Sequence, residues 1–225
     1  MATLHFKQKQ YKQASKYLKL MSIEDGWNSI ATHVRIQLAE CEQYLQHPEV
    51  FVTACLGLLG PECSDEIRSK YQNQLVDVAT SGLSTVLMRD LYPLIDCRLK
   101  PIMKESYLVG DTLEVDCVLE SNLLHTISFS KLSLTMADAS ADSFMHTSDN
   151  ISFTVRKVTV NPGRNLFKLS TELPSKAKFM FDRIRLELGK LVLSQQLRSS
   201  YEPIAVENSK ATLELEVAQP GKTSN

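Results

Sequence analysis

Five thiol and imidazole side chains, the types that bind zinc, lie between residues 33 and 63. They are His33, Cys41, His47, Cys55 and Cys63. A structural zinc ion takes four thiolate or imidazole ligands, so the first three could bind it with either Cys55 or Cys63. Cys41, however, falls on an apolar stripe at helical spacing, which favours a core residue over a ligand. The pattern therefore predicts no metal site.

Acid–base chemistry would need a histidine or two carboxylates held in a fixed arrangement. His33 lies at the edge of the apolar stripe, and we expect it to be partly exposed and hydrogen-bonded to the next helical hairpin. The carboxylate pairs Glu40/Glu42 and Glu214/Glu216 are typical of the solvated face of a helix and of a strand. These groups are therefore interpreted as structural.

The chain carries no motif of the phosphate-binding, dinucleotide-binding, zinc-protease or serine-hydrolase type. The sequence predicts no catalytic, cofactor-binding or metal-binding residue, no cofactor, and a protein that is not an enzyme. An enzyme of unrecognised geometry is the alternative, and its activity would depend on His33 or His125.

The chain has five cysteines, an odd number at irregular spacing. Each lies in an apolar pattern, which indicates free buried thiols. A disulfide between Cys97 and Cys117 is the alternative.

Basic residues gather in three places: Lys7, Lys9, Lys12, Lys16 and Lys19; Arg98, Lys100 and Lys104; Arg156 and Lys157. Each group could contact lipid headgroups or an acidic partner, but a solvated face is the favoured interpretation. A net charge of −1 gives no argument for nucleic acid. The polar N-terminus and the lack of a long apolar run predict a cytosolic protein.

The period of the apolar residues changes near residue 85, from helical spacing to alternation. Before this point we expect helices over 11–21 and 27–45, a third over 49–59, and a fourth that begins at Ser64 as N-cap. Residues 1–82 are predicted to be an α-helical hairpin region, the end of a tetratricopeptide-like solenoid. Trp27 is predicted to be a buried packing anchor between the hairpins.

After this point, about eight short strands are predicted with no helical period between them. Residues 112–119, 132–136, 167–171 and 213–217 alternate, and 151–160 change phase midway, as at a β-bulge. Gly189-Lys190 predicts a two-residue hairpin turn. We expect an immunoglobulin-like antiparallel β-sandwich over 88–219 and a disordered tail over 220–225. The fold class is thus α+β in segregated domains.

The segment 26–41 combines several unlike residue types in order. It reads G-W at 26–27 and T-H-V-R-I-Q-L-A-E-C at 32–41. This motif resembles the end of the helical region in the family of large subunits of the TRAPP II tethering complex, the subunit 10 family. A Lys/Gln-rich helix over 6–20 and the turn V-N-P-G-R-N at 160–165 are also similar to that family. The resemblance covers most of the chain and a late part of such a subunit.

The resemblance implies a non-catalytic scaffold that docks other TRAPP II subunits in Golgi and endosomal trafficking. The TRAPP II complex is a guanine-nucleotide exchange factor for Rab-family GTPases, so these would be indirect partners, and a weak membrane-surface contact is also implied. The implied location is cytoplasmic, peripheral at the trans-Golgi network. The alternative is a peptide or cargo adaptor that binds through a sandwich edge strand or a helical groove.

Overall fold

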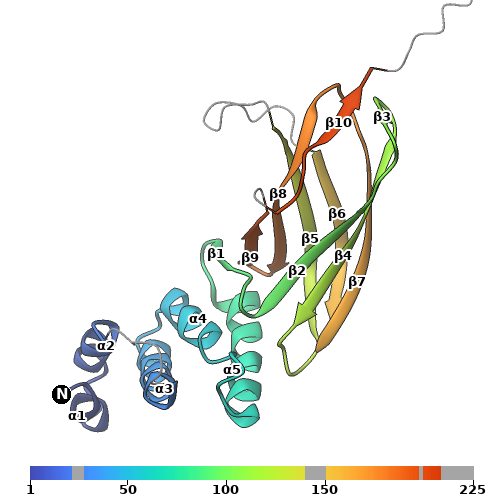
Figure 1. Cartoon of the computed structure of the whole chain (residues 1–225). Coiled ribbons are helices and arrows are strands. Elements are labelled where there is room, and N and C mark those ends of the chain that lie inside the picture. Colours follow the sequence, from blue (N-terminus) through green and yellow to red (C-terminus); the bar gives the residue numbers. More distant parts are fainter. Residues whose placement is uncertain (22–27, 140–150, 198–199, 209–225) are drawn as a thin grey trace, which may run out of the picture.

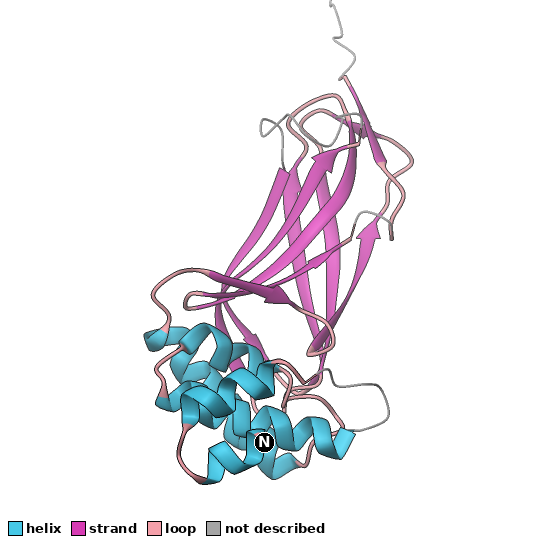
Figure 2. Cartoon of the chain, turned by 90° about the vertical axis from the view of Figure 1, so that its left-hand side faces the viewer, coloured by secondary structure: helices cyan, strands magenta, loops and turns pink. Residues whose placement is uncertain are grey.

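The computed structural model describes residues 1–21, 28–139, 151–197 and 200–208. Helices gather at one end and strands at the other (Figures 1 and 2). The helical elements are α1 (Ala2–Lys7), α2 (Tyr11–Lys19), α3 (Asn28–Tyr44), α4 (Pro48–Leu56), α5 (Asp65–Asp77) and η1 (Val78–Gly82), a π-helical turn. The strands that follow make the fold a mixture of α and β, as predicted.

The predicted helices are found with two corrections. The helix expected over 6–20 is divided into α1 and α2 at Lys9, which has φ +59°. The third helix ends at Leu56 rather than at 59, and residues 57 to 60 form turns. Ser64 caps α5 as predicted, since its hydroxyl accepts from the backbone N–H of Ile67 at 3.5 Å.

In the described part of the chain, ten strands follow in two sheets. They are β1 (Leu87–Asp90), β2 (Ile95–Ile102), β3 (Tyr107–Leu108), β4 (Thr112–Ser121), β5 (Ile127–Asp138), β6 (Ile151–Val160), β7 (Gly163–Glu172), β8 (Lys178–Leu188), β9 (Leu191–Gln196) and β10 (Ile204–Glu207). The smaller sheet has the order β2-β4-β7. In the larger, β8 pairs with β5 on one edge and with β9 and β10 on the other; β6, β1 and β3 extend it.

The phase change predicted within 151–160 is present, but it is not the predicted bulge. In β6 the buried positions shift from Phe153 to Val158, and Lys157 between them has φ +56°. β5 shifts phase at the same level, and the pairing keeps one register on both sides, with Phe129 opposite Val158 and Lys131 opposite Arg156. A bulge would place an extra residue in one strand. Instead, the alternation of buried and exposed side chains shifts by one residue in both strands at the same level, and the register between them is unchanged.

One hydrophobic core joins the helical end to both sheets. It includes Phe51 and Leu75 from α4 and α5, Val115 from the small sheet, and Leu132 and Leu186 from the large sheet. A smaller cluster joins α1, α2 and α3. Neither sheet closes on itself. The immunoglobulin-like topology and the solenoid end stay predictions, and the strand predicted at 213–217 and the tail at 220–225 lie outside the described residues.

The hairpin between β8 and β9 turns at Gly189-Lys190, as predicted, and its tip contacts η1. Gly189 has φ +55°, and Lys190 donates from its backbone N–H to the Ala79 carbonyl at 3.0 Å. The Lys190 ammonium donates to the Ser84 carbonyl at 2.7 Å. A Cβ at position 189 would overlap the Ala79 carbonyl. The glycine therefore permits close contact between the sheet and the helical end.

We expect Gly189→Ala to lower the free energy of unfolding by about 2 kcal/mol, from backbone strain and overlap with Ala79 together. Gly163→Ala is the matched control, because Gly163 also has a positive φ of 78° but nothing within 4 Å of its added Cβ. Denaturant unfolding of both variants measures the difference. Equal losses would show that the contact with η1 contributes nothing.

Candidate functional site

Helix α5 is joined to the loop between β4 and β5 by one buried side chain, Gln72, which is 2% exposed. Its amide nitrogen donates to the His125 carbonyl at 2.7 Å. Its amide oxygen accepts from the backbone N–H groups of Leu124 and His125 at 3.0 and 3.3 Å. One glutamine thus satisfies three backbone groups of the β region, which fixes the position of the loop on the helix.

Two neighbours of Gln72 on α5 extend this joint. The Arg68 guanidinium donates to the carbonyls of Leu59 (3.3 Å) and Asn122. The Ser69 hydroxyl lies 2.8 Å from Nε2 of His125. Contacts from successive turns of one helix hold the helical end and the sheets in a defined orientation. His125, considered above as a catalytic histidine, serves as a partner in this joint.

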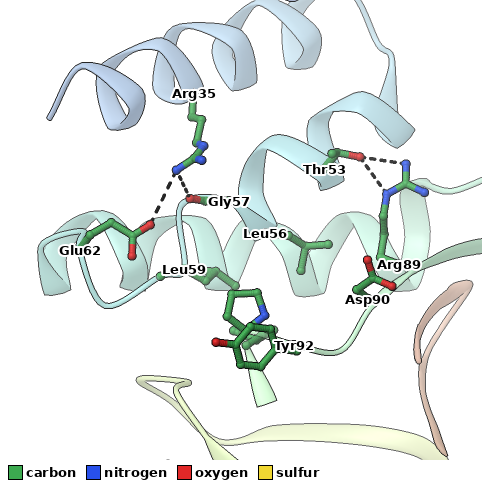
Figure 3. Close-up of a pocket in the computed structure, with 12 residues that line it drawn as sticks. Arg35, Thr53, Leu56, Gly57, Leu59, Glu62, Arg89, Asp90 and Tyr92 are labelled. Atoms are coloured by element: carbon green, nitrogen blue, oxygen red, sulfur yellow. Dashed lines mark hydrogen bonds and ion pairs between the residues drawn. The ribbon is translucent and has the colours of Figure 1, made fainter. Parts of the chain in front are cut away.

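A groove runs beside the joint, between the helices and the segment from β1 to β2. One hollow of about 590 Å³ lies between α2, α3 and α4, and a second of about 310 Å³ lies between α4 and residues 89–94. Both are lined by Arg35, Thr53 and Arg89. Figure 3 shows the second hollow, with Arg35 and Arg89 extending from opposite sides and Tyr92 below. The two hollows form one surface, termed here the α4 groove.

Each of the two arginines of the α4 groove donates to a neutral acceptor, and Arg35 also has an ion pair with Glu62. Arg89 donates through Nε and Nη2 to the Thr53 hydroxyl at 3.0 and 2.9 Å (Figure 3). Arg35 donates through Nη1 to the Gly57 carbonyl at 3.1 Å and lies 3.7 Å from a Glu62 carboxylate oxygen. Among the described residues, Arg89 has no ion pair. The Arg89 guanidinium can therefore bind a carboxylate of a partner chain, although Glu49, Glu62 and Asp90 also line the groove.

Glu42 is fully buried, so its predicted place on a solvated helix face is wrong. Its carboxylate accepts from the Lys19 ammonium at 2.7 Å, from His47 Nδ1 at 2.8 Å and from the Ser15 hydroxyl. Burial raises the pKa of this carboxyl, but its hydrogen bonds with Lys19, Ser15 and His47 outweigh burial, and the pKa lies below 4.5. The Glu42 cluster (Ser15, Lys19, Glu42 and His47) ties α2 and the start of α4 to α3.

The sequence contained a signal for this burial. Glu42 follows Leu38 by four residues, so it lies on the same face as the apolar stripe. Glu40 lies off that stripe and is exposed, 3.9 Å from Lys70. Its predicted solvation is confirmed. Gln72 gave a similar signal, because buried Leu75 follows it by three residues and therefore lies on the same face of α5.

The structure does not bring the zinc-type side chains together. His33 lies on the exposed face of α3, 3.0 Å from Gln37 of its own helix rather than bonded to the next hairpin. His47 contacts Glu42, and the Cys63 thiol lies 3.5 Å from the Thr32 hydroxyl. In the part of the chain that the structure describes, no three metal-binding side chains form a cluster.

All five cysteines are buried free thiols, as predicted. Burial raises the pKa of the thiol of Cys41 to about 11 and that of Cys55 to about 12. The sulfurs of Cys97 and Cys117 lie 3.9 Å apart on neighbouring strands. A hydrogen bond to Cys117, together with burial, raises the pKa of Cys97. The thiols of Cys41, Cys55 and Cys97 therefore stay protonated at neutral pH and are poor nucleophiles.

The lysines of α1 and α2 are exposed, in keeping with a solvated face, and Lys19 also serves the Glu42 cluster. Across the described ranges, no helix is both long and apolar enough to cross a membrane. Trp27, His146, Glu214 and Glu216 lie outside the described residues, so the packing role predicted for Trp27 stays a prediction.

Comparison with curated proteins gives a relative for nearly the whole chain. Over 207 residues, the chain is 27% identical to trafficking protein particle complex subunit 10 of Dictyostelium discoideum. The match covers 88% of this chain and 14% of that protein. A comparison with models of known protein families found no match.

Solved structures give only slight likenesses. A sporulation control protein from Bacillus subtilis matches half of this chain and 48% of its own, with 18% identity and a TM-score of 0.31. An alkylpurine DNA glycosylase from Pseudomonas fluorescens matches 89% of this chain and 53% of its own, with 13% identity and a TM-score of 0.33. At such TM-scores neither structure bears on the fold or function of this chain.

The described residues form a helical end that is fixed to two sheets and flanked by a groove. The sequence match adds its relationship: the chain is related to the large subunits of the TRAPP II complex and spans about one seventh of the length of its subunit 10 relative. The resemblance inferred from residues 26–41 is thereby confirmed.

Proposed function

We propose that the chain is a non-catalytic scaffold module that docks other subunits of a TRAPP II-type tethering complex. The observation that carries this proposal is the match to trafficking protein particle complex subunit 10 over 88% of the chain. The structure supports it through the joint at Gln72 and the α4 groove beside that joint. A fixed angle between two parts is what a scaffold needs to present a docking surface.

The finer elements of the proposal follow from the relationship. Other TRAPP II subunits are the direct partners, and Rab-family GTPases are reached indirectly, with the exchange centre on other subunits. The module acts in Golgi and endosomal trafficking, in the cytoplasm and peripherally at the trans-Golgi network, with a weak contact to the membrane surface. Residues 1–82 form the end of an α-solenoid, and residues 88–219 form an immunoglobulin-like sandwich.

Affinity capture with tagged residues 1–225 from cytosol, followed by mass spectrometry, tests the docking role. The wild-type chain is expected to recover other TRAPP II subunits. We expect Arg89→Glu to reduce recovery by about tenfold or more, because it reverses the charge in the α4 groove and removes both bonds to Thr53.

Arg98→Glu is the matched control, because Arg98 makes the same charge change at a side chain 72% exposed on β2, away from the groove. Its recovery is expected to equal that of the wild type. Loss of recovery in both variants, or in neither, would remove the α4 groove from the docking surface. Unfolding curves must first show that both variants fold.

A second candidate is a peptide or cargo adaptor, favoured by the size of the hollow between α2, α3 and α4, about 590 Å³. An adaptor would bind short peptides in isolation, whereas a subunit-docking module would bind folded subunits only. A peptide-library screen on the immobilised chain separates the two functions.

A further inference from the structure

The outer face of the large sheet carries a regular array of polar side chains, set by the strand register. In one row, Arg156 of β6, Lys131 of β5 and Glu187 of β8 lie side by side. In the next, Arg185 of β8 lies between Ser133 and Ser194; in the third, Arg183 lies between Thr135 and Gln196. The opposite face of the same strands is apolar and buried. This array therefore faces solvent.

Positive charge dominates this array. We term Lys131, Arg156, Arg183 and Arg185 the basic sheet face. Glu187 lies within it, 3.2 Å from Lys131, and Asp90 lies at its β1 edge, beside Ser194. In the described part of the chain, the three arginines have no ion pair. Their charge is left for a partner outside the fold.

The outer face of the small sheet gives a contrast within the same molecule. Its rows mix the two signs, as in Asp96–Glu120–Arg164 and Lys100–Asp116–Lys168 across β2, β4 and β7. Such alternation is typical of a solvated surface. The excess of cations on the large sheet is therefore not a general property of the exposed strands.

The arginine side chains lie against the sheet rather than extending into solvent. The Nε atoms of Arg183 and Arg185 are buried and have no hydrogen-bond acceptor among the residues that the structure describes. Their cross-strand neighbours are Ser133, Thr135, Ser194 and Gln196, all of them uncharged, and Ser133 is 4% exposed. A carboxylate that approached this face would accept from the Nη groups of these guanidiniums, which carry a full charge and have no ion pair among the described residues.

We propose that the basic sheet face binds an extended acidic segment of a partner protein. Arg183 and Arg185 are two residues apart on one strand, about 6.6 Å, which is also the repeat of side chains on one face of an extended peptide. Acidic side chains at alternate positions would meet both arginines. Planar guanidinium groups suit paired carboxylates.

An anionic membrane fits this face less well. The cations of Arg183 and Arg185 are partly buried, and the array lacks the large apolar side chains that insert between lipids. Val192 and Met88 lie only at its margin. The face adjoins the α4 groove at Asp90, but none of its four cations lines that groove, so the inference does not rest on the proposed TRAPP II role.

The test uses the full chain and a fluorescent peptide of about twelve residues that alternates glutamate and threonine. At low salt we expect saturable binding by fluorescence anisotropy, and R183E/R185E is expected to weaken it by about tenfold or more. R183Q/R185Q, which adds no negative charge, is expected to weaken it as well. The control is R164E/K168E, the same charge change on the small sheet, which is expected to leave binding within about twofold.

Three outcomes would overturn the inference. The first is no binding by a folded wild-type chain, and the second is equal weakening by the large-sheet and small-sheet variants. The third is binding to phosphatidylserine vesicles without binding to the peptide, which would assign the face to membranes. Unfolding curves of every variant confirm that each comparison is made between folded proteins. These peptide-binding and vesicle-binding measurements do not depend on whether Arg89→Glu reduces the capture of TRAPP II subunits, so the two proposals can fail separately.

Discussion

Gln72→Ala is expected to lower the free energy of unfolding by about 3–4 kcal/mol. The change leaves two backbone N–H groups, those of Leu124 and His125, and the His125 carbonyl without their partner. A buried polar group that loses its hydrogen bond costs about 1–3 kcal/mol, and water that enters the space recovers part of it. Denaturant unfolding followed by circular dichroism measures the loss.

Asn73→Ala is the control for Gln72→Ala, because Asn73 is the next residue of α5 and is exposed. Its effect is expected to stay within about 0.5 kcal/mol. If Gln72→Ala behaved like Asn73→Ala, the joint between α5 and the β4–β5 loop would contribute nothing to stability. A rigid presentation of the α4 groove would then have no support.

Glu42→Gln is expected to lower the free energy of unfolding by about 3 kcal/mol at neutral pH. The amide keeps the shape of the side chain but loses the charge that attracts Lys19 and His47. Breaking a buried ion pair costs about 3–5 kcal/mol. We place the loss at the lower end, since the Lys19 side chain is 41% exposed and can turn toward water.

The loss in Glu42→Gln is expected to depend on pH in a defined direction. The pKa of Glu42 is lower in the folded state than its ordinary value of 4.5, so the folded state binds the proton less tightly than the unfolded state. The carboxylate therefore stabilises the fold fully above pH 4.5, and this contribution is lost as pH falls through the folded pKa. The difference between wild type and variant should shrink below pH 4.5.

Glu40→Gln provides the matched comparison on the same helix. Glu40 is 43% exposed and lies 3.9 Å from Lys70, so its neutralisation is expected to cost less than about 1 kcal/mol. Urea titrations at a series of pH values distinguish the two glutamates. A pH-independent difference for Glu42→Gln would show that packing, and not charge, holds the Glu42 cluster.

Local patterns were sufficient to predict most elements of this fold. Ser64 followed by two acidic residues marked the start of α5, and Gly189-Lys190 marked the β8–β9 turn. Both features depend on residues adjacent in sequence, where capping and turn chemistry act. The division between α1 and α2 at Lys9 was missed because a positive φ at lysine leaves no sign in the sequence.

The site could not be predicted in the same way, because it is made by distant residues. Gln72 meets a loop more than fifty residues away, and Glu42 meets Ser15 across 27 positions. Glu42 was predicted to be solvated and Gln72 was not singled out, because only the fold supplies their partners. The α4 groove likewise depends on the pairing of β1 with β9, about a hundred residues later in the chain, which places Arg89 beside Thr53.

The central claim is that this chain docks other TRAPP II subunits as a folded module, and direct binding tests it. The chain is immobilised and exposed to purified TRAPP II complex that lacks its own copy of these residues, and association is followed by biolayer interferometry. We expect saturable binding of the complex to the immobilised chain, which Arg89→Glu weakens and Arg98→Glu leaves unchanged. A folded chain that binds none of the complex at any concentration tested would contradict it.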